Sequence, residues 1–430
     1  MKYLLWFLIL TLPFQFALNV SESFDLAVTR ILIPAIFLIW LVRGLARREV
    51  WVPKKMEAGL AAIFIFISFA SILLGEDWSR GVRKLVYFFS MFPIFLVGAD
   101  LFKDSDVKEK TVKFIALGGF LAALAGIIQF GLQFVIGLDS ELDIFKKAAP
   151  IFLGQSFGEL VVTNPSWLVN VSGETLMRAF GFFPDPHMFS FFVSLAFFTG
   201  LGYFFKEEDR SSKILLGTGL TVMFLAIFFS FTRGAYLGVF AGIMFFTAPA
   251  LCKAGWFSRI AVAFLAIVIL LIALNPGAIS QRLISSFNLK EGSNLERLKN
   301  WQQALDVIRD YPVLGVGLGN YASIIKPTVP ERSSIYAHNL FLDIAAETGV
   351  ANGVIFLSLI LISIWRQIKN GRIVNLGIAS GLICFLVHSV FDTPLFSPQV
   401  LCLLLIILAI GIHSKEDKLK AQNSKCGVAV

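Results

Sequence analysis

Charged residues are scarce in this chain: Lys, Arg, Asp and Glu make up only 15% of its 430 residues, whereas 57% are hydrophobic and 45 are Phe. The mean hydropathy of +0.78 excludes a water-soluble globular protein. Cysteine is rare as well. Because Cys252, Cys384, Cys402 and Cys426 show no Cys-x-x-Cys spacing, the sequence predicts neither a disulfide framework nor a zinc site.

Long apolar runs fill the stretches between the few charged clusters. A hydrocarbon core of roughly 30 Å needs about 20 helical residues, and backbone at that depth must be helical. The sequence therefore predicts an all-α, polytopic integral membrane protein with about 12 transmembrane helices. The predicted spans are residues 3–20, 27–42, 57–75, 84–102, 112–138, 188–205, 213–231, 235–251, 257–275, 339–365, 373–391 and 398–413. No small-residue cleavage site follows the first span, so we expect it to be retained.

Lys and Arg are distributed unevenly between the predicted loops. More than half of the 37 lie in or beside loops on the side of the N-terminus, and few lie in the short loops on the other side. Such a bias marks the cytoplasmic face, so the net charge of +8 is a topology signal and does not indicate nucleic-acid binding. The two long loops, 139–187 and 276–338, are then extracytoplasmic, and long loops on one face are where function is expected.

The predicted organisation alternates membrane helices with these loops. It comprises N-terminal helices in 1–138, an extracytoplasmic loop in 139–187, helices in 188–275, a large, partly helical extracytoplasmic loop in 276–338, helices in 339–413 and a cytoplasmic tail in 414–430. No internal repeat and no matching pair of Gly- or Pro-broken helices is recognisable, which argues against a transporter built from two halves.

The large loop 276–338 contains a predicted amphipathic helix. Ser293 and Glu296 have capping-box spacing, Pro312 stops the run, and an apolar stripe lies between them. The stripe consists of Leu298, Trp301, Leu305 and Ile308. Arg297 precedes Trp301 by four residues, so the indole could hold the guanidinium. The following GVGLGNY segment, 315–321, is interpreted as a turn, since it neither follows a strand nor opens a dinucleotide-binding unit.

His338 stands at the outer mouth of the predicted tenth span, followed by Asn339. Its near-neutral pKa makes it a candidate general base, although an interfacial capping role fits the composition alone. Arg233 lies in a very short outer turn, where an arginine either serves a polar site or extends to the headgroups. Arg178 opens RAFGFFPDPHMF just before the sixth span. Several arginines and a histidine on one membrane face suit a lipid-linked pyrophosphate, because guanidinium binds phosphate oxygens bidentately.

Other ionisable residues have competing interpretations. His388 and Asp392, four residues apart, indicate a helix-end hydrogen bond, with a metal pair or a proton relay as alternatives. Asp343 and Glu347 favour helix packing or hydrogen bonding over a paired-carboxylate acid–base site. His187 joins a site only if the fold supplies a partner.

In order and spacing, Arg233-Gly234, YPVLGVGLGNY at 311–321 and AHNLFLDIAAETG at 337–349 resemble the O-antigen ligase and polymerase superfamily of bacterial envelope proteins. The similarity runs from about Arg178 to Pro398. One departure is Pro186-His187, where relatives often carry Pro-Asn.

The resemblance implies transfer of a glycan from a polyprenyl-pyrophosphate carrier to a hydroxyl of a lipid, glycan or protein acceptor. The reaction would be inverting, without metal or cofactor, on the outer face of the cytoplasmic membrane. Arg233 and Arg297 would contact the pyrophosphate, and His338 would orient or deprotonate the acceptor. Substrate-binding candidates beside them are Arg178, Trp301 and Asn339.

Three other functions compete with this one. A polymerase of the same superfamily would transfer the glycan to another carrier-linked glycan, and the motifs do not separate it from a ligase. A lipid-linked oligosaccharide flippase or secondary transporter should carry charge at mid-membrane and repeated halves. A scaffold without activity leaves the polar loop 276–338 unexplained.

Overall fold

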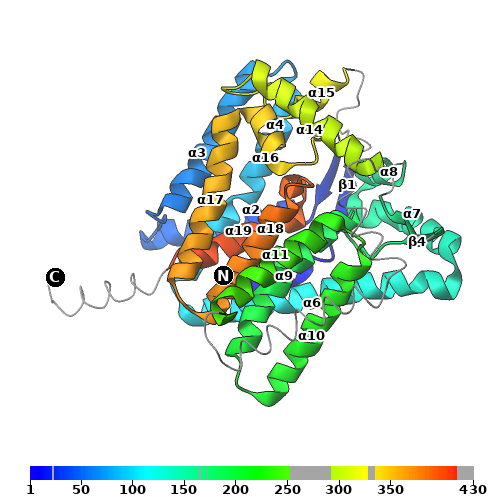
Figure 1. The fold of residues 1–430 in the computed structure, drawn as a ribbon. Helices are drawn as coiled ribbons and strands as arrows, with labels where there is room; N and C mark the ends of the chain where they lie inside the picture. The colour runs from blue at the N-terminus through cyan, green and yellow to red at the C-terminus, as the bar shows by residue number, and fades with distance from the viewer. Residues whose placement is uncertain (22–23, 164–165, 172, 252–291, 328–334, 414–430) are drawn as a thin grey trace.

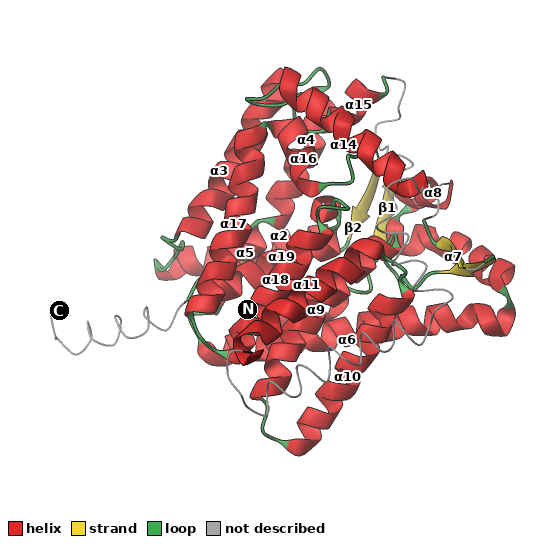
Figure 2. Ribbon diagram, in the orientation of Figure 1, coloured by secondary structure: helices red, strands yellow, loops and turns green. Residues whose placement is uncertain are grey.

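The computed structural model describes residues 1–21, 24–163, 166–171, 173–251, 292–327 and 335–413. Helices dominate this part of the chain (Figure 2). The helices are α1 Lys2–Thr11, α2 Thr29–Arg47, α3 Met56–Ser71, α4 Trp78–Met91, α5 Pro93–Leu101, α6 Ser105–Ile136, α7 Leu138–Leu153, α8 Gln155–Thr163, α9 Pro186–Lys206, α10 Arg210–Phe229, α11 Arg233–Leu251, α14 Gly292–Asp310, α15 Tyr321–Ile325, α16 Leu340–Thr348, α17 Val350–Lys369, α18 Ile373–His388 and α19 Pro398–Gly411. The described residues also form two antiparallel hairpins, β1 Ala17–Ser21 with β2 Phe24–Ala27 and β3 Leu168–Val171 with β4 Glu174–Met177, and two 3-10 helices, Ile72–Leu74 and Pro394–Phe396.

Within the described residues, seven helical segments are long and apolar enough to cross a membrane: Thr29–Arg47, Met56–Leu74, Trp78–Leu101, Ser105–Ile136, Pro186–Lys206, Arg210–Phe229 and Val350–Lys369. Shorter apolar helices are α1, α18 and α19. The predicted all-α membrane architecture is thus confirmed. The count of 12 is not reached in this part of the chain, and the predicted span 257–275 lies outside the described residues.

The predicted first span, 3–20, is wrong in its second half. Helix α1 ends at Thr11, and the chain turns into strand β1 at Ala17. Pro13 has no backbone N–H and cannot continue a helical ladder. The Thr11 hydroxyl lies 3.0 Å from the carbonyl oxygens of Phe7 and Leu8, to which it can donate in turn, and so bonds back into the last turn of the helix.

The predicted tenth span, 339–365, is broken at Gly349. This glycine has φ +90° and separates the short helix α16 from the candidate span α17. A Cβ here would lie 1.9 Å from the Val313 carbonyl oxygen, and the N–H of Val350 donates to Pro312 O at 3.0 Å. The segment after α14 therefore packs into the break. As a result, α16 is a separate short helix that precedes the candidate span α17.

Helices α9 and α18 pack against each other at the centre of the fold, with α6, α10 and α11 around α9 (Figure 1). Small residues bring the two backbones close, since a Cβ at Gly377 would lie 2.5 Å from the Phe198 carbonyl oxygen. The pair is antiparallel: Gly202 near the end of α9 meets Ile373 at the start of α18, and His187 at the start of α9 lies near His388. Each end of the pair thus brings together residues from distant parts of the chain.

Candidate functional site

His338 lies in a turn whose backbone is held in an unfavourable conformation. Its φ of +52° falls in the left-handed region, and it is one of three non-glycine residues with positive φ in the described part of the chain. Asn339 caps helix α16, because its side-chain oxygen accepts from the N–H groups of Phe341 and Leu342. Just before the turn, the Ala337 N–H donates to Asp343 Oδ1 at 2.7 Å. Backbone strain fixed by surrounding bonds is characteristic of functional positions.

Asp392 is the centre of the site. Its Oδ2 lies 2.9 Å from Nδ1 of His187, and its Oδ1 lies 3.6 Å from Nδ1 of His338. Burial opposes ionisation of this carboxyl, but the two imidazoles hold the pKa of Asp392 well below its usual value. The carboxylate is therefore charged, and it connects the start of α9 with the turn before α16.

The charge on Asp392 acts on His338. Burial lowers the pKa of His338, but the Asp392 carboxylate outweighs it and raises the pKa above the usual value near 6.5. The positive charge of Arg297 opposes this rise. The His338 side chain is 42% exposed. With Nδ1 turned to the carboxylate, Nε2 is the other ring nitrogen of this partly exposed side chain.

Asp343 joins the two loops that carry these groups. Besides the Ala337 N–H, it accepts from the hydroxyl of Thr393, the residue after Asp392. Leu340 adds a backbone bond to Ser389 O at 2.9 Å. The favoured interpretation of Asp343 and Glu347 as hydrogen-bonding residues agrees with the structure, where Glu347 accepts from Lys84 Nζ at 2.6 Å.

The predicted hydrogen bond between His388 and Asp392 is wrong. His388 is fully buried and stacks on Phe191, with ring centroids 3.6 Å apart. Within the described part of the protein, neither of its ring nitrogens has a hydrogen-bond partner. Asp392 lies beyond the end of α18 and faces His187 and His338 instead, because the chain leaves the helix after His388.

Arg233 is the first residue of α11, directly beside this cluster. A Cβ on the next residue, Gly234, would lie 2.6 Å from Cδ2 of His388 and 3.2 Å from Cβ of Phe391. Only glycine therefore lets α11 approach the end of α18 this closely. The turn before Arg233 contains a second non-glycine residue with positive φ, Phe231 at +48°.

Arg178, predicted to bind substrate, is buried and engaged with protein groups. Its guanidinium donates to Ser230 O at 2.7 Å, Ser166 O at 2.9 Å and Thr232 Oγ1 at 2.9 Å. Two of these acceptors lie in the turn before Arg233. We therefore interpret Arg178 as a residue that holds this turn in place.

Helix α14 brings Arg297 and Trp301 to the same end of the molecule. It packs on α16, and the Trp301 ring lies 6.3 Å from that of Phe391. The helix begins at Gly292, one residue before the predicted start. Its predicted apolar stripe is partly wrong, because Leu298 and Leu305 are exposed while Ala304 and Val307 are buried.

The glycine-rich segment 315–321 forms a turn, as predicted. Gly315, Gly317 and Gly319 all have positive φ. The Leu318 N–H donates to the Ser71 hydroxyl, and Asn320 accepts from the Asp77 N–H. The segment thus ties the end of α14 to α3 and α4.

The structure therefore brings together the neighbourhoods of His338, Arg233 and Arg297, together with two residues not assigned to the site from sequence, His187 and Asp392. The sequence signal for Asp392 was its position just after a span. Its partner His187 precedes it by 205 residues and could not be paired with it by spacing.

Comparison with known proteins agrees with this location. Residues 218–357 match the O-antigen ligase family, a segment that contains Arg233, Arg297, Trp301 and His338. No curated protein matches the chain. The match supports the predicted resemblance to the O-antigen ligase superfamily over this segment, and the apolar helices agree with a multi-pass membrane protein.

Proposed function

We propose that this protein is a membrane glycan transferase that moves an oligo- or polysaccharide from a polyprenyl-pyrophosphate carrier to an acceptor hydroxyl. The family match supports ligase- or polymerase-like glycan processing. The observation that carries the specific reaction is the contact between His338 and the buried Asp392 carboxylate, beside the start of α11 and beneath α14.

The chemistry requires a base for the acceptor and charge stabilisation for the leaving group. Nε2 of His338 takes the acceptor proton as the hydroxyl oxygen attacks the anomeric carbon, and Asp392 stabilises the imidazolium that forms. The bond from the anomeric carbon to the pyrophosphate oxygen breaks, and the polyprenyl pyrophosphate leaves with both electrons of that bond. A single displacement inverts the anomeric configuration.

The arginines face the leaving group in this proposal. Arg233 and Arg297 bind the pyrophosphate oxygens, and fixed guanidinium groups stabilise the developing charge without reorganisation or a metal. Trp301 and Asn339 border the same space, although Asn339 also caps α16. We propose that the reaction takes place on the outer face of the cytoplasmic membrane. The topology predicted from the distribution of Lys and Arg assigns Arg233, Arg297 and His338 to that face.

In vitro transfer tests this function. Full-length protein in detergent is incubated with a polyprenyl-pyrophosphate glycan and a panel of lipid, glycan and protein acceptors, with and without EDTA. Product that forms in EDTA, with inverted anomeric configuration by NMR, supports the proposal. Product that depends on added metal contradicts the metal-free mechanism.

The acceptor panel separates the ligase from the polymerase, because a polymerase extends a second carrier-linked glycan. The same preparation in liposomes tests the transporter alternative. Movement of the donor across the bilayer without transfer to any acceptor would replace the transferase proposal.

A further inference from the structure

A cavity of about 400 Å³ lies at the end of the molecule opposite His338. Both central helices pass from one place to the other: α9 runs from His187 to Tyr203 and Lys206 in the cavity wall, and α18 runs from Ile373 in the wall to His388. At 1.5 Å per residue, the 21 residues of α9 span roughly 30 Å, about the thickness of a bilayer core. The cavity is therefore separate from the proposed transfer site.

The wall of the cavity is largely apolar. Phe102 and Val112 contribute from the α5 and α6 region, Ile378 from α18 and Ile410 from α19. An apolar wall of this kind, open between membrane helices, suits an acyl chain better than a fully hydrated ion.

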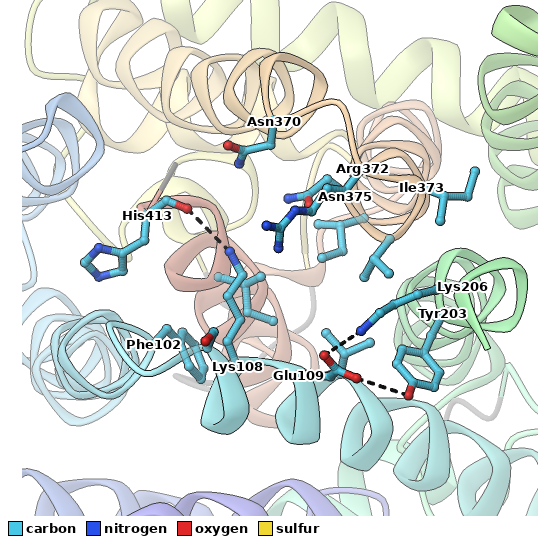
Figure 3. Close-up of a pocket in the computed structure, with 15 residues that line it drawn as sticks. Phe102, Lys108, Glu109, Tyr203, Lys206, Asn370, Arg372, Ile373, Asn375 and His413 are labelled. Carbon is cyan, nitrogen blue, oxygen red and sulfur yellow. Dashed lines mark hydrogen bonds and ion pairs between the residues drawn. The ribbon is translucent and has the colours of Figure 1, made fainter. Parts of the chain in front are cut away.

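The rim of the cavity is cationic. Figure 3 shows Lys108 and Arg372 extending into it from opposite sides. Lys206 is paired with Glu109 at 2.5 Å, and the rim also carries Arg372 and Lys108, whose Nζ donates to His413 O at 3.5 Å. In the described ranges Arg372 forms no ion pair, and it lies at the start of α18, where helix N–H groups also favour an anion.

The position of the rim agrees with this charge. Lys108, Lys206 and Arg372 belong to or border the predicted loops 103–111, 206–212 and 366–372, which the excess of Lys and Arg assigns to the cytoplasmic face. That leaflet carries anionic lipids, and basic pockets between helices on this side bind their headgroups.

We propose that this cavity binds an anionic phospholipid of the cytoplasmic leaflet, with the headgroup phosphate between Lys108 and Arg372 and an acyl chain along the apolar wall. The combination of a cationic rim and an apolar wall favours a lipid over free phosphate. The site is distinct from the transfer site and independent of the proposed function.

Native mass spectrometry of the full-length protein tests the proposal. The protein is titrated with phosphatidylglycerol or phosphatidylcholine of identical acyl chains, in the presence or absence of inorganic phosphate. We expect phosphatidylglycerol to bind roughly 10- to 30-fold more tightly, as two headgroup–cation contacts imply. We also expect millimolar phosphate not to displace it.

A charge-matched pair of variants identifies the cavity. Lys108→Gln with Arg372→Gln keeps both side-chain stems and should abolish the preference. Lys110→Gln with Lys369→Gln removes the same charge from α6 and the end of α17, outside the cavity lining, and should retain it. Equal binding of both lipids, a preference that survives in the first variant, or displacement by free phosphate would overturn the proposal. Monodisperse elution of both variants shows that folding is preserved.

Discussion

The two ends of the α9–α18 pair differ in how their charged groups are held. Near His388, the buried Asp392 carboxylate faces two imidazoles, and two turns with left-handed backbone, at Phe231 and His338, lie beside it. Near Ile373, the charges stand on long side chains around a hollow, and the Lys206–Glu109 pair is 43% exposed on each side. Catalysis needs fixed geometry, whereas headgroup binding needs mainly charge and room.

The largest expected effect comes from removing the proposed base. His338→Ala should lower the transfer rate roughly 10²- to 10⁴-fold, because general base catalysis contributes that much. The rate is measured with saturating donor and acceptor. Lys326→Ala, an exposed change that follows α15, is the control and should transfer normally. Wild-type rates in His338→Ala would remove the base from the mechanism.

The next largest effect on the transfer rate is expected at Arg297, and Arg309 on the same helix serves as its control. Arg297→Ala should reduce transfer roughly 10²-fold, as expected when one group that stabilises transition-state charge is lost. Arg309→Ala lies in the last turn of α14 and should leave transfer unchanged. The two variants are compared by kcat and by KM for the donor. Equal losses in both would indicate that α14 acts only through its overall charge.

The third prediction concerns the pH dependence of transfer, which tests the contact between Asp392 and His338. His338 must be neutral to act as a base, so wild-type transfer should fall as the pH drops through its raised pKa, above 6.5. Asp392→Asn removes the carboxylate, and burial, which is the largest influence on the pKa of His338, then acts with Arg297 to lower it against the remaining charge of Asp343. The acid limb of the normalised pH–rate profile should therefore move to lower pH while the maximum rate decreases. An acid limb that stays in place would separate Asp392 from His338.

A smaller effect is expected at Asp343, which positions other residues without reaching the substrate. Asp343→Asn replaces one acceptor oxygen with an NH2 group, so either the Ala337 N–H or the Thr393 hydroxyl loses the acceptor to which it donates. Leaving a buried donor unsatisfied costs about 1–3 kcal/mol. We expect a lower midpoint of thermal unfolding and a roughly tenfold lower kcat, with KM for the donor retained. A change confined to KM would instead indicate direct contact with the donor.

The smallest effect is expected at the opposite end. Lys206→Met breaks the exposed ion pair with Glu109 and should change the free energy of unfolding by less than about 1 kcal/mol. Thermal unfolding in the same detergent compares it with Asp343→Asn. A larger loss than in Asp343→Asn would reverse the contrast between the two ends.

The sequence predicted features that local pattern controls. Apolar runs located most of the helices. Gly residues predicted the turn at 315–321, and a Ser and a Pro predicted the two ends of α14. The break at Gly349 could not be predicted, because it depends on packing of the Val313 carbonyl against that glycine. The first span was overextended because apolar residues continue past Pro13 into a β-hairpin.

Local spacing failed most clearly for pairs that only the fold creates. His388 and Asp392 have helical spacing, yet the helix ends between them and the carboxylate faces His187 and His338. Arg178 resembled a phosphate ligand by position, but its three backbone and hydroxyl acceptors come from elements more than ten residues away.

The bonds that Asp343 makes to both loops have an evolutionary consequence. Because one carboxyl bonds to both loops, a substitution that displaces Asp343 acts on the turn of His338 and on the residue after Asp392 together. Descendants that acquire a new sugar or acceptor must vary elsewhere, in segments that border the site but share none of these bonds. Under the proposed function, the two bonds of Asp343 thus confine such variation to the surroundings of the site.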